Sequence, residues 1–118
     1  MVRNRALKIS GRAVRGTTIV DLEGTINLGN SPTLRTNLFE TLQTAPRLAL
    51  NMSGVEYIDS SGIATLIEVL RKARDLNKEL ALFGLSKAVH DVLKLTNLLG
   101  VFRIFDSEER ALAENTAS

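Results

Sequence analysis

Residues 57–63 place one carboxylate and two hydroxyl groups side by side, in Asp59, Ser60 and Ser61. The segment follows a hydrophobic strand pattern and precedes a helix pattern, so these groups lie near a predicted helix N-terminus. The free N–H groups of a first helical turn attract anions, phosphate included. The residue types therefore suit a site that receives or reads a phosphoryl group.

Helix capping is the simpler interpretation of the same residues. Asp and Ser are among the commonest N-cap residues, and either Asp59 or Ser60 could cap the helix. One cap is enough, however, and Gly62 in the first turn costs about 1 kcal/mol relative to alanine. A glycine there is expected where another group approaches the backbone closely. Both interpretations remain open on these residues alone.

Catalysis by one of these serines would need a general base within hydrogen-bond reach. His90 is the only histidine, and it lies beside Asp91 in a different predicted helix. The sequence has no Gly-x-Ser-x-Gly elbow, no evident carboxylate pair and no Gly-rich nucleotide loop. It also has no cysteine, which excludes disulfides and thiolate metal sites. We therefore expect no enzymatic activity, no cofactor and no metal site.

The 118 residues suit one domain spanning 1–118, and 44% of them are hydrophobic. Residues 1–15 hold five basic side chains and no acid, which suits a protected edge strand better than a nucleic-acid surface. No apolar run approaches the roughly 20 residues of a membrane span, and no signal peptide is evident. We expect a cytoplasmic protein that neither binds nucleic acid nor inserts into membranes, with flexible segments at 1–5 and 114–118.

Hydrophobic periodicity predicts an α/β fold. The expected elements are strands at 6–14 and 17–22, a helix opened by Ser31, a strand at 47–52, a loop, a helix at 61–75, a strand at 79–83, a helix capped by Ser86, a short strand at 102–105 and a helix starting near Ser107. A hairpin followed by alternating helices and strands predicts a largely parallel sheet with one antiparallel edge.

The stretch from Leu48 to Ile63 resembles the signature of the STAS domain family, the bacterial anti-sigma factor antagonists. That signature is a hydrophobic strand, a Ser-Gly-Val turn and an Asp-Ser-Ser-Gly helix opening. The resemblance extends over nearly the whole chain, including residues 22–24, 32–42 and 89–107. It implies the STAS fold, a small mixed, mostly parallel sheet with an N-terminal antiparallel hairpin, covered by about four helices.

The resemblance also implies a partner switch. In such systems the unmodified antagonist binds an anti-sigma factor serine kinase of the histidine-kinase-like ATPase fold and frees the sigma factor, which regulates transcription. The kinase phosphorylates the serine after the aspartate, here Ser60, and the complex dissociates until a serine phosphatase removes the phosphate. The partner-binding residues implied are Asp59, Ser60, Ser61, Gly62 and Asn27.

One departure from the family pattern favours an alternative. Many phosphorylated antagonists read Gly-Glu-Leu-Asp after the second strand, whereas this chain has Gly24-Thr25-Ile26-Asn27, and Asn27 carries no charge. The alternative is a STAS scaffold that is never phosphorylated, or a cytoplasmic subunit of a lipid-transport ABC complex. A weak homodimer through the exposed N-terminal strand is also open.

Overall fold

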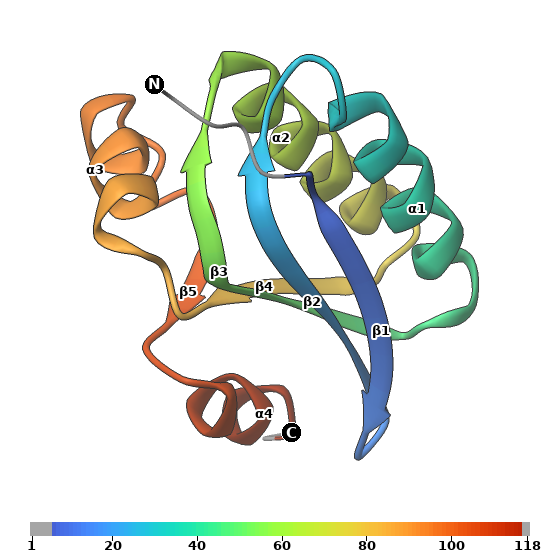
Figure 1. Cartoon of the computed structure of the whole chain (residues 1–118). Coiled ribbons are helices and arrows are strands. Elements are labelled where there is room, and N and C mark those ends of the chain that lie inside the picture. The colour runs from blue at the N-terminus through green and yellow to red at the C-terminus, as the bar shows by residue number, and fades with distance from the viewer. Residues whose placement is uncertain (1–5, 117–118) are drawn as a thin grey trace.

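The computed structural model describes residues 6–116 of the chain (Figure 1). Its elements follow the predicted order: β1 (Lys8–Val14), β2 (Thr17–Ile26), α1 (Ser31–Thr44), β3 (Arg47–Ile58), α2 (Ser60–Asp75), β4 (Glu79–Phe83), α3 (Lys87–Leu95), β5 (Arg103–Phe105) and α4 (Glu108–Thr116). The expected flexibility of 1–5 and of the last two residues of the tail 114–118 lies outside the described residues, while α4 keeps its helical backbone as far as Thr116.

The strands form one sheet in the order β1-β2-β3-β4-β5. β1 and β2 pair antiparallel through a tight turn at Arg15 and Gly16, whose φ angles of 52° and 80° suit a hairpin. The pairs β2–β3, β3–β4 and β4–β5 are parallel. The predicted α/β class, hairpin and mostly parallel sheet are therefore confirmed. Because parallel strands share their polarity, the ends of β2 and β3 lie at the same edge of the sheet.

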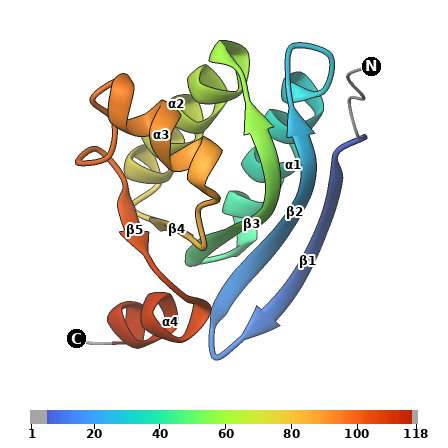
Figure 2. The same cartoon turned by 60° about the vertical axis from the view of Figure 1, so that its left-hand side comes forward.

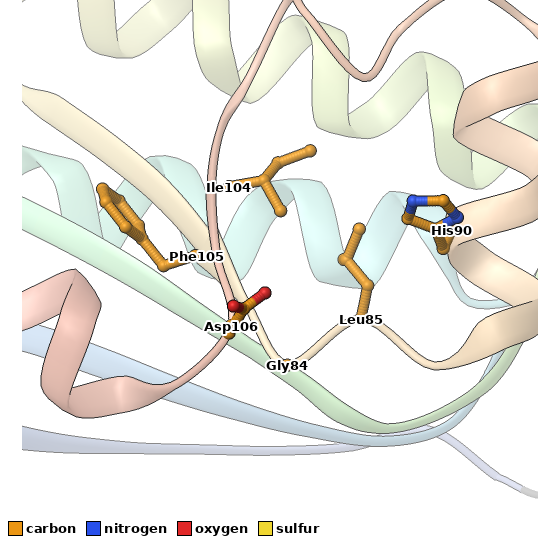
Figure 3. Close-up of a pocket in the computed structure, with 6 residues that line it drawn as sticks. All are labelled: Gly84, Leu85, His90, Ile104, Phe105 and Asp106. Atoms are coloured by element: carbon orange, nitrogen blue, oxygen red, sulfur yellow. The ribbon is translucent and has the colours of Figure 1, made fainter.

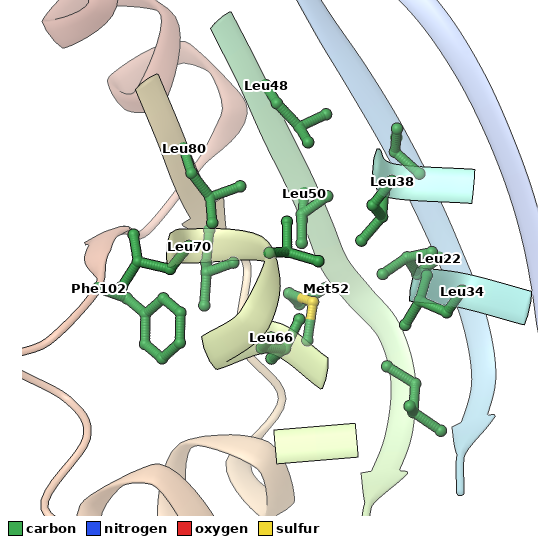
Figure 4. Packing of buried hydrophobic residues seen from close by; sticks show 14 of the residues in the cluster. Leu22, Leu34, Leu38, Leu48, Leu50, Met52, Leu66, Leu70, Leu80 and Phe102 are labelled. Atoms are coloured by element: carbon green, nitrogen blue, oxygen red, sulfur yellow. The ribbon is translucent and has the colours of Figure 1, made fainter. Parts of the chain in front are cut away.

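Helices α1 and α2 cover one face of the sheet, as Figures 1 and 2 show. The main hydrophobic core lies between these helices and the strands (Figure 4). Aliphatic side chains dominate this core, which includes Leu22, Leu34, Leu38, Leu48, Leu50, Met52, Leu66, Leu70, Leu80 and Phe102. This packing fixes α2 against the end of β3, and so fixes the segment that joins them.

Helix α4 packs on the opposite face of the sheet. Side chains alternate along a strand, so Ile19 points away from the side on which its neighbour Val20 is buried. A second core cluster forms there from Ile19, Ala49, Phe83, Ala111 and Leu112. Arg12 of β1 joins the hairpin to α4, because its guanidinium hydrogen bonds to Asp21 at 2.7 Å and to Glu108 at 2.5 Å. These two bonds raise the pKa of Arg12 and lower the pKa of each carboxyl.

Strands β2 and β3 are longer than the sequence predicts. We expected β2 to end at residue 22, with one short strand possible at the start of the loop from Gly24, and β3 to end at residue 52. The strands run instead to Ile26 and Ile58. Their ladder continues through register shifts between Asp21 and Glu23 and between Gly24 and Thr25. These irregularities break the two-residue alternation, so the sequence pattern is typical of a loop. Both strands therefore reach the edge that carries Asp59.

The start of α1 also differs from its prediction by one residue. We expected Ser31 to cap this helix, but Asn30 is the N-cap and Ser31 is already helical. The Asn30 side chain makes no capping bond to the helix. Instead, its Oδ1 accepts from the Asn27 N–H at 2.9 Å and its Nδ2 donates to the Thr25 carbonyl at 2.8 Å. Asn30 therefore stabilises the loop between β2 and α1.

The Arg12 contacts predict how α4 is held on the sheet. Replacing Arg12 by alanine should lower the free energy of unfolding by only about 0.2–1 kcal/mol, because the ion pairs are exposed. The amides of Ala111 and Leu112 should nevertheless exchange with deuterium faster, because α4 opens more often. Mass spectrometry of hydrogen exchange measures this. Arg47→Ala, which removes the exposed pair with Glu79, is the control and should leave exchange in α4 unchanged; equal exchange of α4 in both variants would contradict the prediction.

Candidate functional site

The carboxylate of Asp59 caps α2, as the sequence predicts for this residue or its neighbour. Its Oδ1 accepts hydrogen bonds from the Ser61 N–H at 2.9 Å and the Gly62 N–H at 3.1 Å. The Ser61 hydroxyl donates to the same oxygen at 2.5 Å. One carboxylate oxygen therefore satisfies two otherwise unpaired N–H groups of the first turn.

Asp59 also joins α2 to the loop between β2 and α1. Its second oxygen, Oδ2, accepts from the Leu28 N–H at 3.2 Å. Its own N–H donates to the Ile26 carbonyl at 3.1 Å, beyond the last rung of the β2–β3 ladder. Leu28 could not be assigned to the site from the sequence, because nothing local links residue 28 to residue 59.

These hydrogen bonds control the ionisation of Asp59. Partial burial of the carboxylate opposes its charged form, but the bonds from Ser61, Gly62 and Leu28 favour that form and outweigh burial. The pKa of Asp59 is consequently held below its ordinary value. The residue is a fixed negative charge beside Ser60 at neutral pH.

The two adjacent serines have different environments. Ser60 is exposed, and its hydroxyl has no hydrogen-bond partner among the described side chains, those of residues 6–113, or the described backbone. Ser61 is partly buried, and its hydroxyl is bonded to Asp59. Of the two hydroxyls, only that of Ser60 is free to react without breaking the helix cap.

Gly62 is required by the core rather than by a ligand. A Cβ atom at this position would lie 2.5 Å from Cγ1 of Ile58 and 2.7 Å from Cγ2 of Ile26. The sequence correctly indicates a close approach to this backbone, but the approaching groups are buried side chains. The first-turn N–H groups that the sequence analysis expected to be free are in part already occupied, because those of Ser61 and Gly62 donate to Asp59.

The Asn27 side chain shapes its own loop. Its Oδ1 accepts from the Gly29 N–H at 3.0 Å and the Asn30 N–H at 3.3 Å. Asn27 therefore lies next to Leu28, within the loop that Asp59 holds. Its side-chain oxygen Oδ1 faces the backbone of that loop. Asn27 supports the surface around Ser60 by fixing this loop.

His90 lies in a separate small cavity. The cavity has a volume of about 130 Å³ and is lined by Gly84, Leu85, His90, Ile104, Phe105 and Asp106 (Figure 3). His90 projects from α3 toward Leu85 and Ile104, and no lining residue comes from 57–63. The cavity thus brings no general base to Ser60.

The described side chains, those of residues 6–113, include no group of three or more acidic or histidine residues placed to hold a metal ion. No helix within the same range has the length and apolar character needed to cross a bilayer.

A family model described as the STAS domain matches residues 8–111. The chain belongs to the STAS domain family. The match includes both segments that meet at Asp59, so the STAS domain contains the whole candidate site. The resemblance of the sequence to this family and its fold is confirmed.

Several known proteins with similar chains are described as anti-sigma factor antagonists. The anti-sigma F factor antagonist of Paenibacillus polymyxa is 26% identical over 110 residues, which are 92% of this chain and 94% of that one. The crystal structure of an anti-sigma factor antagonist from Mycobacterium paratuberculosis has a TM-score of 0.84 at 20% identity, covering 92% and 93% of the two chains. The Bacillus cell fate determinant SpoIIAA in its phosphorylated form has a TM-score of 0.70 at 19% identity, covering 92% and 98%.

The contacts of Gly62 predict the effect of a single methyl group. Gly62→Ala should destabilise the STAS domain, because overpacking costs about 1–3 kcal/mol and the gain in helix propensity offsets at most about 1 kcal/mol of that cost. Chemical denaturation measures the difference. Gly100→Ala is the matched control, since a Cβ there has no atom within 4 Å, and its free energy of unfolding should stay within about 0.5 kcal/mol of wild type. A Gly62→Ala variant as stable as this control would show that the packing is not tight.

The ionised cap predicts a pH dependence of stability. Because folding lowers the pKa of Asp59, its contribution is present above the unfolded pKa of about 3.9 and is lost as the pH falls through the folded pKa. Asp59→Asn keeps a capping side chain but cannot titrate. The stability advantage of wild type over this variant should therefore shrink between about pH 5 and pH 2. Asp106→Asn, which removes an exposed carboxylate, is the control; a constant advantage for wild type over Asp59→Asn would contradict the prediction.

Proposed function

We propose that this STAS domain is an anti-sigma factor antagonist that binds an anti-sigma factor serine kinase and is released when Ser60 is phosphorylated. The observation that carries the proposal is the exposed, unbonded hydroxyl of Ser60 beside a helix cap already completed by Asp59. Phosphorylation of Ser60 leaves that cap in place. Phosphorylation of Ser61 would remove a hydrogen bond from it.

The chemistry asks little of this chain. Oγ of Ser60 attacks the γ-phosphorus of ATP, a new O–P bond forms, and the bond to the β–γ bridging oxygen breaks to release ADP. The hydroxyl proton passes to a base on the kinase. The antagonist contributes a fixed, accessible oxygen, which is consistent with a role that is not enzymatic.

The charges around Ser60 explain why the modification would separate the two proteins. A phosphate adds about −1.5 to −2 charges at pH 7. The N–H groups of Ser61 and Gly62 are bonded to Asp59, so the phosphate stays at the surface beside a second negative charge. A docked partner would have to desolvate both groups, and like charges brought together at an interface cost several kcal/mol.

The fold should survive the same modification. Negative charge near a helix N-terminus is favourable by about 0.3–1 kcal/mol, and the core under α2 does not include the exposed Ser60 side chain. Similar proteins support the proposal, since the Paenibacillus polymyxa relative and SpoIIAA are both named as anti-sigma factor antagonists, and the structure of SpoIIAA is known in a phosphorylated form. A cytoplasmic location and a phosphatase that restores Ser60 belong to the same proposal.

The uncharged Asn27 favours a second candidate, a STAS module that docks without being phosphorylated. Its side chain is committed to the loop through Gly29 and Asn30, so it offers no charge to the active site of a kinase. Neighbouring permease and ATPase genes would favour this candidate, whereas neighbouring kinase and phosphatase genes would favour the antagonist.

Phosphorylation separates the two candidates directly. We expect the chain, incubated with ATP and its cognate anti-sigma factor kinase, to gain one phosphate that mass spectrometry places on Ser60. Ser61→Ala is the matched control and should still be modified, whereas Ser60→Ala should not. Phosphate on Ser61, or modification of Ser60→Ala at the wild-type rate, would overturn the assignment.

A variant that carries the charge permanently tests the release step of the same proposal. Ser60→Asp should unfold at the wild-type denaturant concentration and bind the kinase at least tenfold more weakly, a change of about 1.4 kcal/mol. Wild-type affinity in this folded variant would count against the switch.

A further inference from the structure

Four large hydrophobic side chains are exposed among residues 6–116: Leu28, Tyr57, Leu95 and Val101. Leu28 is 75% exposed and Tyr57 is 52% exposed. These two come from the segments that meet at Asp59, one from the loop after β2 and the other from the end of β3. Two of the four exposed apolar side chains therefore belong to the segments that meet next to Ser60.

Leu28 is held in its exposed position by the backbone on both sides. Its N–H donates to Asp59 Oδ2 at 3.2 Å. The residues on either side of it are fixed by two asparagines. The Asn27 side chain accepts from the N–H groups of Gly29 and Asn30, and the Asn30 side chain accepts from the Asn27 N–H. A leucine in a free loop would lose conformational entropy when a partner bound it. The backbone of Leu28 is already fixed by these bonds, so less of that entropy remains to be lost, which favours binding.

Tyr57 reaches the same edge from the sheet. It pairs with Thr25 in the parallel ladder, one position before Ile58 pairs with Ile26. Ile58 is fully buried, whereas the Tyr57 side chain is half exposed to solvent. Tyr57 lies three residues before Ser60, and tyrosine is enriched among the residues that dominate interface energies.

We infer that Leu28 and Tyr57 are the apolar anchors with which this chain docks on the anti-sigma factor kinase. Their side chains become buried in the interface, and Ser60 is thereby presented to the active site of the kinase. The inference rests on the proposed function and adds the residues that provide affinity before phosphorylation. A phosphate on Ser60 would then have to enter the desolvated part of the interface, where a charge is least tolerated.

Other occupants of this surface are less compatible with its charge. A lipid surface would bring anionic headgroups toward the ionised Asp59. A second copy of the chain, related by a twofold axis, would bring two Asp59 carboxylates toward each other. A kinase site already suited to ATP and its cations accommodates one carboxylate beside the reacting serine.

The test measures the affinity of full-length variants for each purified anti-sigma factor kinase encoded in the same genome, by titration calorimetry. Leu28→Ala should bind about tenfold more weakly than wild type, and Tyr57→Ala by a similar factor. Leu95→Ala is the matched control, because Leu95 is also a leucine and is 83% exposed at the end of α3. It should bind within about twofold of wild type, and all variants should unfold at the wild-type denaturant concentration.

The outcomes separate this inference from the function on which it rests. If wild type binds none of the kinases and gains no phosphate, the proposed function and the inference both fall. If wild type binds and Leu28→Ala binds equally well, or if Leu95→Ala is weakened as much, only the inference falls. A homodimer seen by analytical ultracentrifugation and abolished by Leu28→Ala would also overturn it, since the patch would then be a self-association surface.

Discussion

The structure around the site depends on one carboxylate. Asp59 accepts hydrogen bonds from the first turn of α2 and from the loop after β2, while its own backbone N–H bonds to the end of β2. Two segments separated by about 30 residues are thereby fixed to each other. Removing this carboxylate would loosen the start of the helix and the loop together, so the helix cap beside Ser60 and the position of Leu28 depend on the same group.

Much of this arrangement follows from local sequence. The helix at 60–75 has a strong apolar periodicity, and an aspartate before two serines is a clear capping signal, so both were predictable. The order of strands and helices was predictable for the same reason. The capping residue of α1 was wrong by one position, because Asn30 bonds backward to its own loop and leaves Ser31 inside the helix.

The features that could not be predicted depend on pairing between distant segments. The last four residues of β2 and the last six of β3 look like a loop in the sequence, and only the register shifts between the two strands show how they pair. The bond from Leu28 to Asp59 and the packing of Ile26 and Ile58 against Gly62 have the same origin. Patterns within one segment indicate its secondary structure, but they do not indicate which groups from elsewhere complete its hydrogen bonds.

The contact between Arg12 and Glu108 spans 96 positions of the sequence. During synthesis the hairpin leaves the ribosome long before α4 exists, so the apolar strip of Ile19, Ala49 and Phe83 has nothing to cover it while the rest of the sheet assembles. Exposed strands of this kind are prone to aggregation in partly folded chains. The nascent chain is therefore expected to depend most on chaperones in the interval before α4 has been translated.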